Sequence, residues 1–348
     1  MIKPTEEELK EFKNSWNPLV QEDISSADYY FNSYAHFGIH EEMLKDSVRT
    51  GSYQKAIMSN KHLFQDKIVL DVGSGTGILC MFAAMAGAKH VYGIECSEIV
   101  HVARNIIKDN NLSDKITFIQ SKAEEAVLPV EKVDIIISEW MGYLLLYESM
   151  LDTVLFCRDK WLKEDGLIFP DRAQMYIAGI EDAEYKQEKL GYWNNVYGFN
   201  YQYVKPCIME EPIIDTVGEN AVNTSSYCIL DIDLYKCKKE DLEFVSPFYL
   251  KAARKDFVHA FIVWFDIIFG CGHKPVTFTT SPFGKYTHWK QSVFYFEEDL
   301  VCDTNDMISG IFALKKNTKN VRDLDIKIKF NFTKNNSSIE RINYYRLR

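Results

Sequence analysis

The sequence predicts an α/β domain with a parallel sheet, followed by an all-β domain. In the first half, short β-rich apolar runs at 67–72, 89–94, 115–120 and 133–138 alternate with helical patterns, as in successive βαβ units. In the second half, apolar and polar residues alternate strictly over 324–332, as in a strand with one wet face. Similar runs recur at 226–234, 257–269, 289–296 and 307–314, so we expect an antiparallel barrel or sandwich.

The same patterns divide the chain into three predicted parts. Residues 1–50 begin polar, become aromatic and continue as a predicted helix through Glu41–Lys45 toward Arg49. Residues 51–170 form the predicted α/β domain, and residues 171–348 form the predicted β domain. The β domain is interrupted at about 182–216 by a helical segment rich in aromatic residues. Such an insertion is a candidate partner surface, although packing on its own β domain is an equally good interpretation.

Composition limits the classes of function. A chain of 348 residues with 14% aromatic and 26% charged residues is typical of about two folded domains. The net charge of −10 argues against a direct nucleic-acid partner and favours a basic protein or peptide substrate. Eight scattered cysteines without a C-x-x-C pair predict buried free thiols in a reducing compartment. The polar N-terminus predicts no signal peptide, and the apolar run 261–265 is too short to cross a membrane.

A glycine-rich turn follows the first predicted strand. Lys67–Leu70 leads directly into Asp71 and the alternating glycines Gly73, Gly75 and Gly77. These glycines allow a tight strand-to-helix turn and close approach of the backbone to a ligand. Glu95, at the end of the next strand, can accept from both ribose hydroxyls of a nucleoside cofactor. The turn alone is compatible with NAD, FAD or S-adenosylmethionine, but the glycine spacing and the preceding Asp71 favour S-adenosylmethionine.

Two glutamates, Glu139 and Glu148, bracket an apolar stretch just beyond the strand-like run Val133–Ile137. Carboxylates among Trp, Met, Tyr and Leu are costly to bury unless a cation or several donors meet them. Ligands bind outside the carboxyl ends of strands in open α/β sheets, and a carboxylate pair there suits a guanidinium. The alternative is that each acid caps a helix or pairs with a nearby arginine, and these residues alone leave both open.

Five motifs in a fixed order make this chain resemble the type I protein arginine methyltransferases from about Tyr29 to the C-terminus. They are Tyr34-Ala-His-Phe-Gly-Ile-His-Glu-Glu-Met-Leu-Lys-Asp46, Asp71-Val-Gly-Ser-Gly-Thr-Gly-Ile-Leu-Cys80, Ser138-Glu-Trp-Met-Gly-Tyr143, Tyr147-Glu-Ser-Met150 and Tyr286-Thr-His-Trp-Lys-Gln291. The resemblance implies a Rossmann-like class I S-adenosylmethionine-dependent methyltransferase domain and a β-barrel domain with a dimerisation arm at 182–216. It also implies that the helical segment 1–50 closes over the cofactor.

The resemblance further implies the activity and its setting. The enzyme would give monomethyl and asymmetric dimethylarginine in Gly/Arg-rich segments and histone tails. It would form a homodimer or a higher oligomer and would occupy nucleus and cytoplasm. Three rival classes are disfavoured: nucleic-acid methyltransferases by the Ser-Glu-Trp-Met element and the absence of a basic stripe, dehydrogenases by the glycine spacing, and an inactive scaffold by the retained acids and glycines.

Site residues follow from the matching motif positions. Glu139 and Glu148 would hold the substrate guanidinium, and His288 would pass its proton to solvent, although a structural role for this histidine is an equal alternative. The cofactor would be held by residues of the glycine turn together with His40, Arg49, Asp71, Glu95 and Glu124. Among these, Glu95 is assigned to the ribose, Glu124 to the adenine and Arg49 to the methionine carboxylate.

Substrate contacts are assigned in the same way, to Tyr30, Tyr34, Met43, Tyr143, Met150 and Trp289. Tyr30 and Tyr34 would form a lid, and Met43 and Met150 would crowd the substrate nitrogen. Taken without the resemblance, these aromatic residues and methionines are ordinary packing groups. His36 and His40 stand four residues apart, but no third ligand has a usable spacing, so no metal site is expected.

Overall fold

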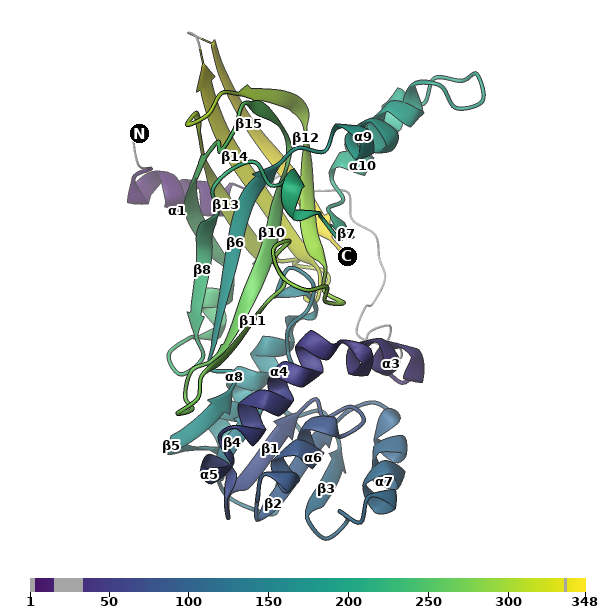
Figure 1. Cartoon of the computed structure of the whole chain (residues 1–348), viewed down its shortest axis with the longest axis vertical. Coiled ribbons are helices and arrows are strands. Elements are labelled where there is room, and N and C mark those ends of the chain that lie inside the picture. The colour runs from purple at the N-terminus through teal and green to yellow at the C-terminus, as the bar shows by residue number, and fades with distance from the viewer. Residues whose placement is uncertain (1–3, 16–33, 335–336) are drawn as a thin grey trace.

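Two lobes stack along the long axis of the molecule, a parallel-sheet lobe and a β lobe (Figure 1). The computed structural model describes residues 4–15, 34–334 and 337–348. Tyr30, expected in the lid, therefore lies outside the described residues.

The parallel-sheet lobe contains five strands in the order β3-β2-β1-β4-β5, all parallel. They are β1 (Ile68–Val72), β2 (His90–Glu95), β3 (Ile116–Gln120), β4 (Val133–Ile137) and β5 (Leu162–Phe169). Four of them fall on the apolar runs predicted as strands, because strands covered on both faces are continuously apolar. The strand order reverses between β1 and its neighbour β4, and ligands of such sheets bind at this switch point.

Helices pack on this sheet and along its upper edge. They are α3 (Phe37–Lys45), α4 (Ser47–Met58), α5 (Lys61–Phe64), α6 (Ile78–Met85), α7 (Ile99–Asp109) and α8 (Met150–Trp161). Helix α4 contacts both α6 and strand β11 of the other lobe, so it lies at the junction of the two lobes.

The β lobe consists of two antiparallel sheets around one apolar core. One sheet has the order β7-β12-β10-β6-β8 with β11 paired to β10, and the other has the order β15-β14-β13-β9. The strands are β6 (Arg172–Ile180), β7 (Ile213–Asp215), β8 (Tyr227–Asp233), β9 (Phe244–Lys251), β10 (Asp256–Phe269), β11 (Val276–Thr279), β12 (Gln291–Cys302), β13 (Met307–Lys316), β14 (Leu324–Lys334) and β15 (Ser337–Leu347). The predicted combination of an α/β and an antiparallel β domain is confirmed.

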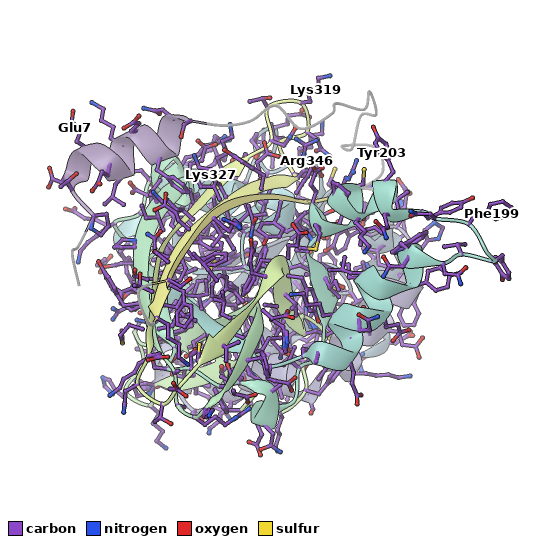
Figure 2. All side chains as sticks on the ribbon, turned by 90° about the horizontal axis from the view of Figure 1, so that it is seen from above. Glu7, Phe199, Tyr203, Lys319, Lys327 and Arg346 are labelled. Carbon is purple, nitrogen blue, oxygen red and sulfur yellow. The ribbon has the colours of Figure 1, made fainter. Side chains whose placement is uncertain are left out.

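An arm leaves the β lobe between β6 and β7 and projects away from it (Figure 1). It carries α9 (Ala183–Lys186), a π-helical turn at Gln187–Gly191, 3-10 turns at Tyr192–Asn194 and Gln202–Val204, and α10 (Lys205–Met209). Phe199 lies near its tip in Figure 2, and Tyr197 and Tyr203 are 93% and 96% exposed. The outer aromatic residues of this segment thus do not pack on their own β lobe.

Helix α1 (Glu6–Asn14) lies on the β lobe, on the side of the molecule opposite the arm (Figures 1 and 2). Its Phe12 packs against Ile311 and Ala313, and buried Lys327 donates to the carbonyl oxygens of Phe12 and Ser15. The expectation that the whole of 1–50 closes over the cofactor is therefore wrong for α1. Two apolar residues, Leu9 and Phe12, in an otherwise polar helix were too weak a signal to predict this docking.

The aromatic core joins the two sheets of the β lobe. The ring of Phe261 on β10 lies 5.4 Å from that of Phe248 on β9 and 5.4 Å from that of Phe330 on β14. All three side chains are fully buried.

Because these contacts hold the sheets together, we expect Phe261→Ala to lower the free energy of unfolding by about 3–5 kcal/mol. The matched control is Phe257→Ala on the same strand. Because the Phe257 side chain is 46% exposed, this change should lower the free energy of unfolding by less than about 1 kcal/mol. Urea denaturation of both variants measures the difference. Equal losses in the two variants would contradict the assigned core.

Candidate active site

A cavity of about 360 Å³ opens beyond the carboxyl ends of β1, β2 and β4, with walls from both lobes. Most residues predicted for the site line it: Tyr34, His40, Met43, Arg49, Gly73, Gly75, Glu95, Glu124, Glu139, Tyr143, Glu148, Met150, His288 and Trp289. Asp71 and Gly77 do not line it. Residues separated by up to about 250 positions in the chain are thereby brought to one site.

The glycine turn has the backbone that its residues predict. Gly73, Gly75 and Gly77 have φ values of +75°, +52° and +86°, which other residues adopt only with strain. A Cβ on Gly73 would lie 2.7 Å from Cε of Met150, so the turn fits closely against this side chain. A Cβ on Gly77 would lie 2.6 Å from the Phe118 ring, which assigns Gly77 to packing of the turn and not to the cavity wall.

Glu95 is held at the end of β2 by two backbone donors. Its Oε2 accepts from the Gly75 N–H at 2.9 Å, and its Oε1 accepts from the Ser97 N–H at 2.8 Å. Two acceptor oxygens fixed in this way fit a pair of ribose hydroxyls. Nearby, a ring nitrogen of buried His40 lies 2.9 Å from the Tyr34 carbonyl oxygen, and Thr153 donates to Glu124 at 3.0 Å.

Asp71 lies behind the turn and is completely buried. It accepts from the Cys80 thiol at 3.1 Å, and its other oxygen has no partner among the described residues. Burial raises the pKa of this carboxyl to about 7. The sequence places Asp71 next to a cationic cofactor, whereas the structure places it one layer below the cavity wall.

The two glutamates stand on the wall of the cavity with different partners. Glu139 accepts from Arg49 Nε at 2.8 Å, and both side chains are only 8% exposed. The second oxygen of Glu139 is buried without a partner among the described residues, so it can accept from a bound ligand. Glu148 accepts from the Tyr34 hydroxyl at 2.9 Å. Arg49, expected to face a cofactor carboxylate, is thus also the partner of Glu139.

His288 is attached to Asp46, a residue that the sequence analysis missed. Both the backbone N–H and Nδ1 of His288 lie within 2.9 Å of one Asp46 oxygen. The other oxygen caps α4 by accepting from the N–H groups of Val48 and Arg49. Burial would raise the pKa of Asp46, but the hydrogen bonds from His288 and Arg49 outweigh it and lower the pKa. The N-cap position before Ser47 was the available signal, but it does not reveal the histidine.

Trp289 supports the site from behind. It is buried, and its Nε1 donates to the Met141 carbonyl at 2.8 Å. Its ring is stacked on Phe278, with centroids 5.7 Å apart. Trp289 lines the cavity, but its Nε1–H group is already hydrogen-bonded to Met141, in the loop between the two glutamates. Tyr143, half buried, stacks on Tyr147 in the same loop.

Comparison with known proteins decides the family. Residues 69–166 match a methyltransferase domain, and residues 171–336 match the arginine methyltransferase oligomerization subdomain. Protein arginine N-methyltransferase 1 of Schizosaccharomyces pombe is 61% identical over 89% of this chain and 91% of its own length. The chain belongs to the protein arginine N-methyltransferase family.

Other members of this family agree. Protein arginine N-methyltransferase 1 of Chlamydomonas reinhardtii is 53% identical over 95% of this chain and 96% of its own length. Among solved structures, the Trypanosoma brucei PRMT1 enzyme–prozyme heterotetrameric complex with AdoHcy has a chain 46% identical to this one. That chain superposes with a TM-score of 0.89, covering 91% of this chain and 100% of its own. The predicted family, the methyltransferase fold and S-adenosylmethionine as methyl donor are thereby confirmed.

This methyltransferase offers a cavity that fits its cofactor. The two fixed oxygens of Glu95 and the close backbone of the glycine turn face the same space. Over 4–15, 34–334 and 337–348, no group of three or more His, Cys, Asp or Glu side chains is placed to hold a metal ion. Over the same ranges, no helix combines the length and apolarity that a membrane crossing requires.

The titration of Asp71 gives a pH-dependent contribution to stability. The pKa of Asp71 is about 7 in the folded chain and has the ordinary value of 3.8 in the unfolded chain. Between these two pH values, the folded state therefore binds more protons than the unfolded state. The contribution of Asp71 to stability therefore falls as pH rises from about 4 to 7. We expect the melting temperature of Asp71→Asn, relative to wild type, to increase over this range. Thermal melts at a series of pH values measure the difference in melting temperature between the variant and wild type. A difference that stays constant with pH would contradict the prediction. The control is Asp165→Asn, which changes an exposed residue of β5.

Proposed function

We propose that this arginine methyltransferase modifies Gly/Arg-rich segments and histone tails, and that Glu139 and Glu148 hold the target guanidinium. The observation that carries the proposal is the pair of carboxylates on the cavity wall, one of which has a buried oxygen without a partner among the described residues. A guanidinium supplies a flat fork of donors that matches such acceptors. The net charge of −10 favours the approach of basic segments.

The chemistry required of the protein is to make a poor nucleophile react. A guanidinium stays protonated at neutral pH, with a pKa above about 12. Hydrogen bonds to the two carboxylates draw its positive charge toward the nitrogens that face them, so the remaining terminal nitrogen keeps more lone-pair character. S-adenosylmethionine supplies the electrophilic methyl group. Holding the reactants in register can contribute roughly 7–11 kcal/mol relative to encounter in solution.

We assign roles to the remaining site residues as part of the same proposal. Glu95 holds the ribose hydroxyls, with His40 beside it, and Glu124 lies on the adenine side. Arg49 orients Glu139 through its Nε. We also assign it to the methionine carboxylate of the cofactor. His288, held by Asp46, receives the proton that the product must lose. Tyr34 fixes Glu148 through its hydroxyl. Tyr30, which lies outside the described residues, is assigned to the same lid only by the family resemblance.

The products proposed are monomethyl and asymmetric dimethylarginine. Met43 and Met150 both line the cavity, and Met150 fits closely against the glycine turn. Side chains of this bulk restrict how a methylated nitrogen can turn in the site. Since histone tails are nuclear and Gly/Arg-rich proteins occur in both compartments, we place the enzyme in nucleus and cytoplasm; imaging of a fluorescent fusion tests this.

We expect Glu148→Gln to lower turnover of a Gly/Arg-rich peptide by about 10²–10³-fold, the usual cost of losing one preorganised electrostatic contact. Binding of S-adenosylhomocysteine, measured by calorimetry, should stay nearly unchanged. Mass spectrometry should detect fragments that lose dimethylamine with wild type and not with the variant. The control is Glu164→Gln, which changes an exposed acid of β5. Near wild-type turnover in Glu148→Gln would contradict the assigned role.

We propose further that the oligomer is a homodimer in which the arm of one copy docks on another. Its support is the exposed aromatic surface of the arm and the match to an oligomerization subdomain. We expect the double variant Phe199→Asp, Tyr203→Asp to sediment as a monomer of 40.4 kDa, where wild type sediments at about twice that mass. Ile342→Asp, on β15 and 44% exposed, is the control for adding charge elsewhere. A dimer that survives in the double variant would exclude the arm as the contact.

A further inference from the structure

We propose that Arg322 is a positioning residue for Glu148, acting from the β lobe through a segment that we call the clamp loop, residues 317–323. The clamp loop joins β13 to β14 and reaches across to the segment that carries the two glutamates, residues 138–150, which we call the acid loop. This inference rests on the proposed role of Glu148 and names what holds that residue in place.

The acid loop has a strained backbone that contacts from other segments must hold in place. Glu148 and Ser149 have φ values of +74° and +60°, and Leu144 and Leu145 have +51° and +63°. Residues with a Cβ are strained in this left-handed region, and such strain persists only where surrounding contacts determine the conformation. The orientation of the Glu148 carboxylate depends directly on this backbone. Contacts from outside the acid loop are therefore needed to fix it.

Arg322 supplies those contacts on both peptide groups of Glu148. The N–H of Glu148 donates to the Arg322 carbonyl at 3.0 Å, and the Arg322 guanidinium donates to the Glu148 carbonyl at 2.6 Å. A third bond runs from the Ser149 hydroxyl to the Val321 carbonyl at 2.5 Å. None of these three bonds uses the Glu148 carboxylate, which lies on the cavity wall and accepts from the Tyr34 hydroxyl at 2.9 Å.

The clamp loop is itself rigid, as a positioning element must be. The Asn317 side chain accepts from the backbone N–H groups two and three residues later, at 2.9 and 3.0 Å. Asn320 accepts from the N–H of Arg322 at 3.1 Å. The Asn317 amide also donates to buried Asp325 at 3.0 Å, and Arg346 contacts the same carboxylate at 2.9 Å. The loop thus presents Arg322 from a backbone that is already fixed within the β lobe.

The test is a double-mutant cycle between Arg322 and Glu148. We expect Arg322→Ala to lower kcat for a Gly/Arg-rich peptide by about 10²-fold, the scale of a small misplacement of a reacting group. KM for the peptide and Kd for S-adenosylhomocysteine should change by less than about threefold. Arg322→Lys should recover part of the loss, because an ammonium group can still donate to the Glu148 carbonyl. In the Glu148→Gln background, Arg322→Ala should cause no further loss.

The controls separate this inference from a general loss of stability and from the role of Glu148. Arg172→Ala removes an exposed arginine of the β lobe that pairs with Asp231, and it should leave kcat unchanged. If Arg322→Ala does not fold, Ser149→Ala removes only the bond to Val321 and takes its place in the cycle. A wild-type kcat in the Arg322 variant, or losses that multiply in the double variant, would overturn the inference. Wild-type turnover in Glu148→Gln alone would instead overturn the proposed function.

Discussion

Two carboxylates must be oriented and left open to a ligand in a partly apolar cavity wall, and much of the structure around the cavity serves this constraint. Burying a charge without a partner is costly, so each acid has a donor of its own. Arg49 donates to Glu139, and the Tyr34 hydroxyl donates to Glu148. Each of these contacts leaves acceptor capacity on the carboxylate, which a guanidinium can use in an enzyme of this family.

The β lobe is part of the active site as well as the oligomerization subdomain. Trp289 donates to the Met141 carbonyl within the acid loop, and His288 is fixed by Asp46 at the start of α4. Arg322, which also lines the cavity, binds the backbone of Glu148. The carboxyl ends of a parallel sheet supply the place for a ligand, but the sheet cannot by itself hold a loop with several left-handed residues. The boundary that the sequence predicts near residue 170 therefore separates two folding patterns and not two functions.

Features that depend on local pattern were predictable, and features that depend on distant contacts were not. Buried strands are apolar runs, so β1, β2, β3 and β4 could be predicted, and acids just after strand ends could be placed at one edge of the sheet. The pairs Arg322–Glu148 and His288–Asp46 join residues 174 and 242 positions apart, and nothing in either segment marks its partner. Asp71 was misplaced for a related reason. Its place in the sequence beside the glycine turn does not reveal whether the side chain lines the cavity or is buried beneath the cavity wall.

Arg346 connects the arm to the clamp loop. Its backbone N–H donates to the carbonyl of Glu210, where the arm returns to the β lobe after α10. Its guanidinium contacts Asp325, the second residue of β14, to which Asn317 of the clamp loop also donates. Asp325 on β14 and Arg346 on β15 lie opposite each other in the paired strands. The contact with the arm and the contact with Asp325 are therefore both made by these two neighbouring strands at the edge of the sheet. The arm is therefore not an independent appendage, since its return segment and the loop that reaches Glu148 share one anchor. The return segment of the arm and the clamp loop both depend on contacts with β14 and β15.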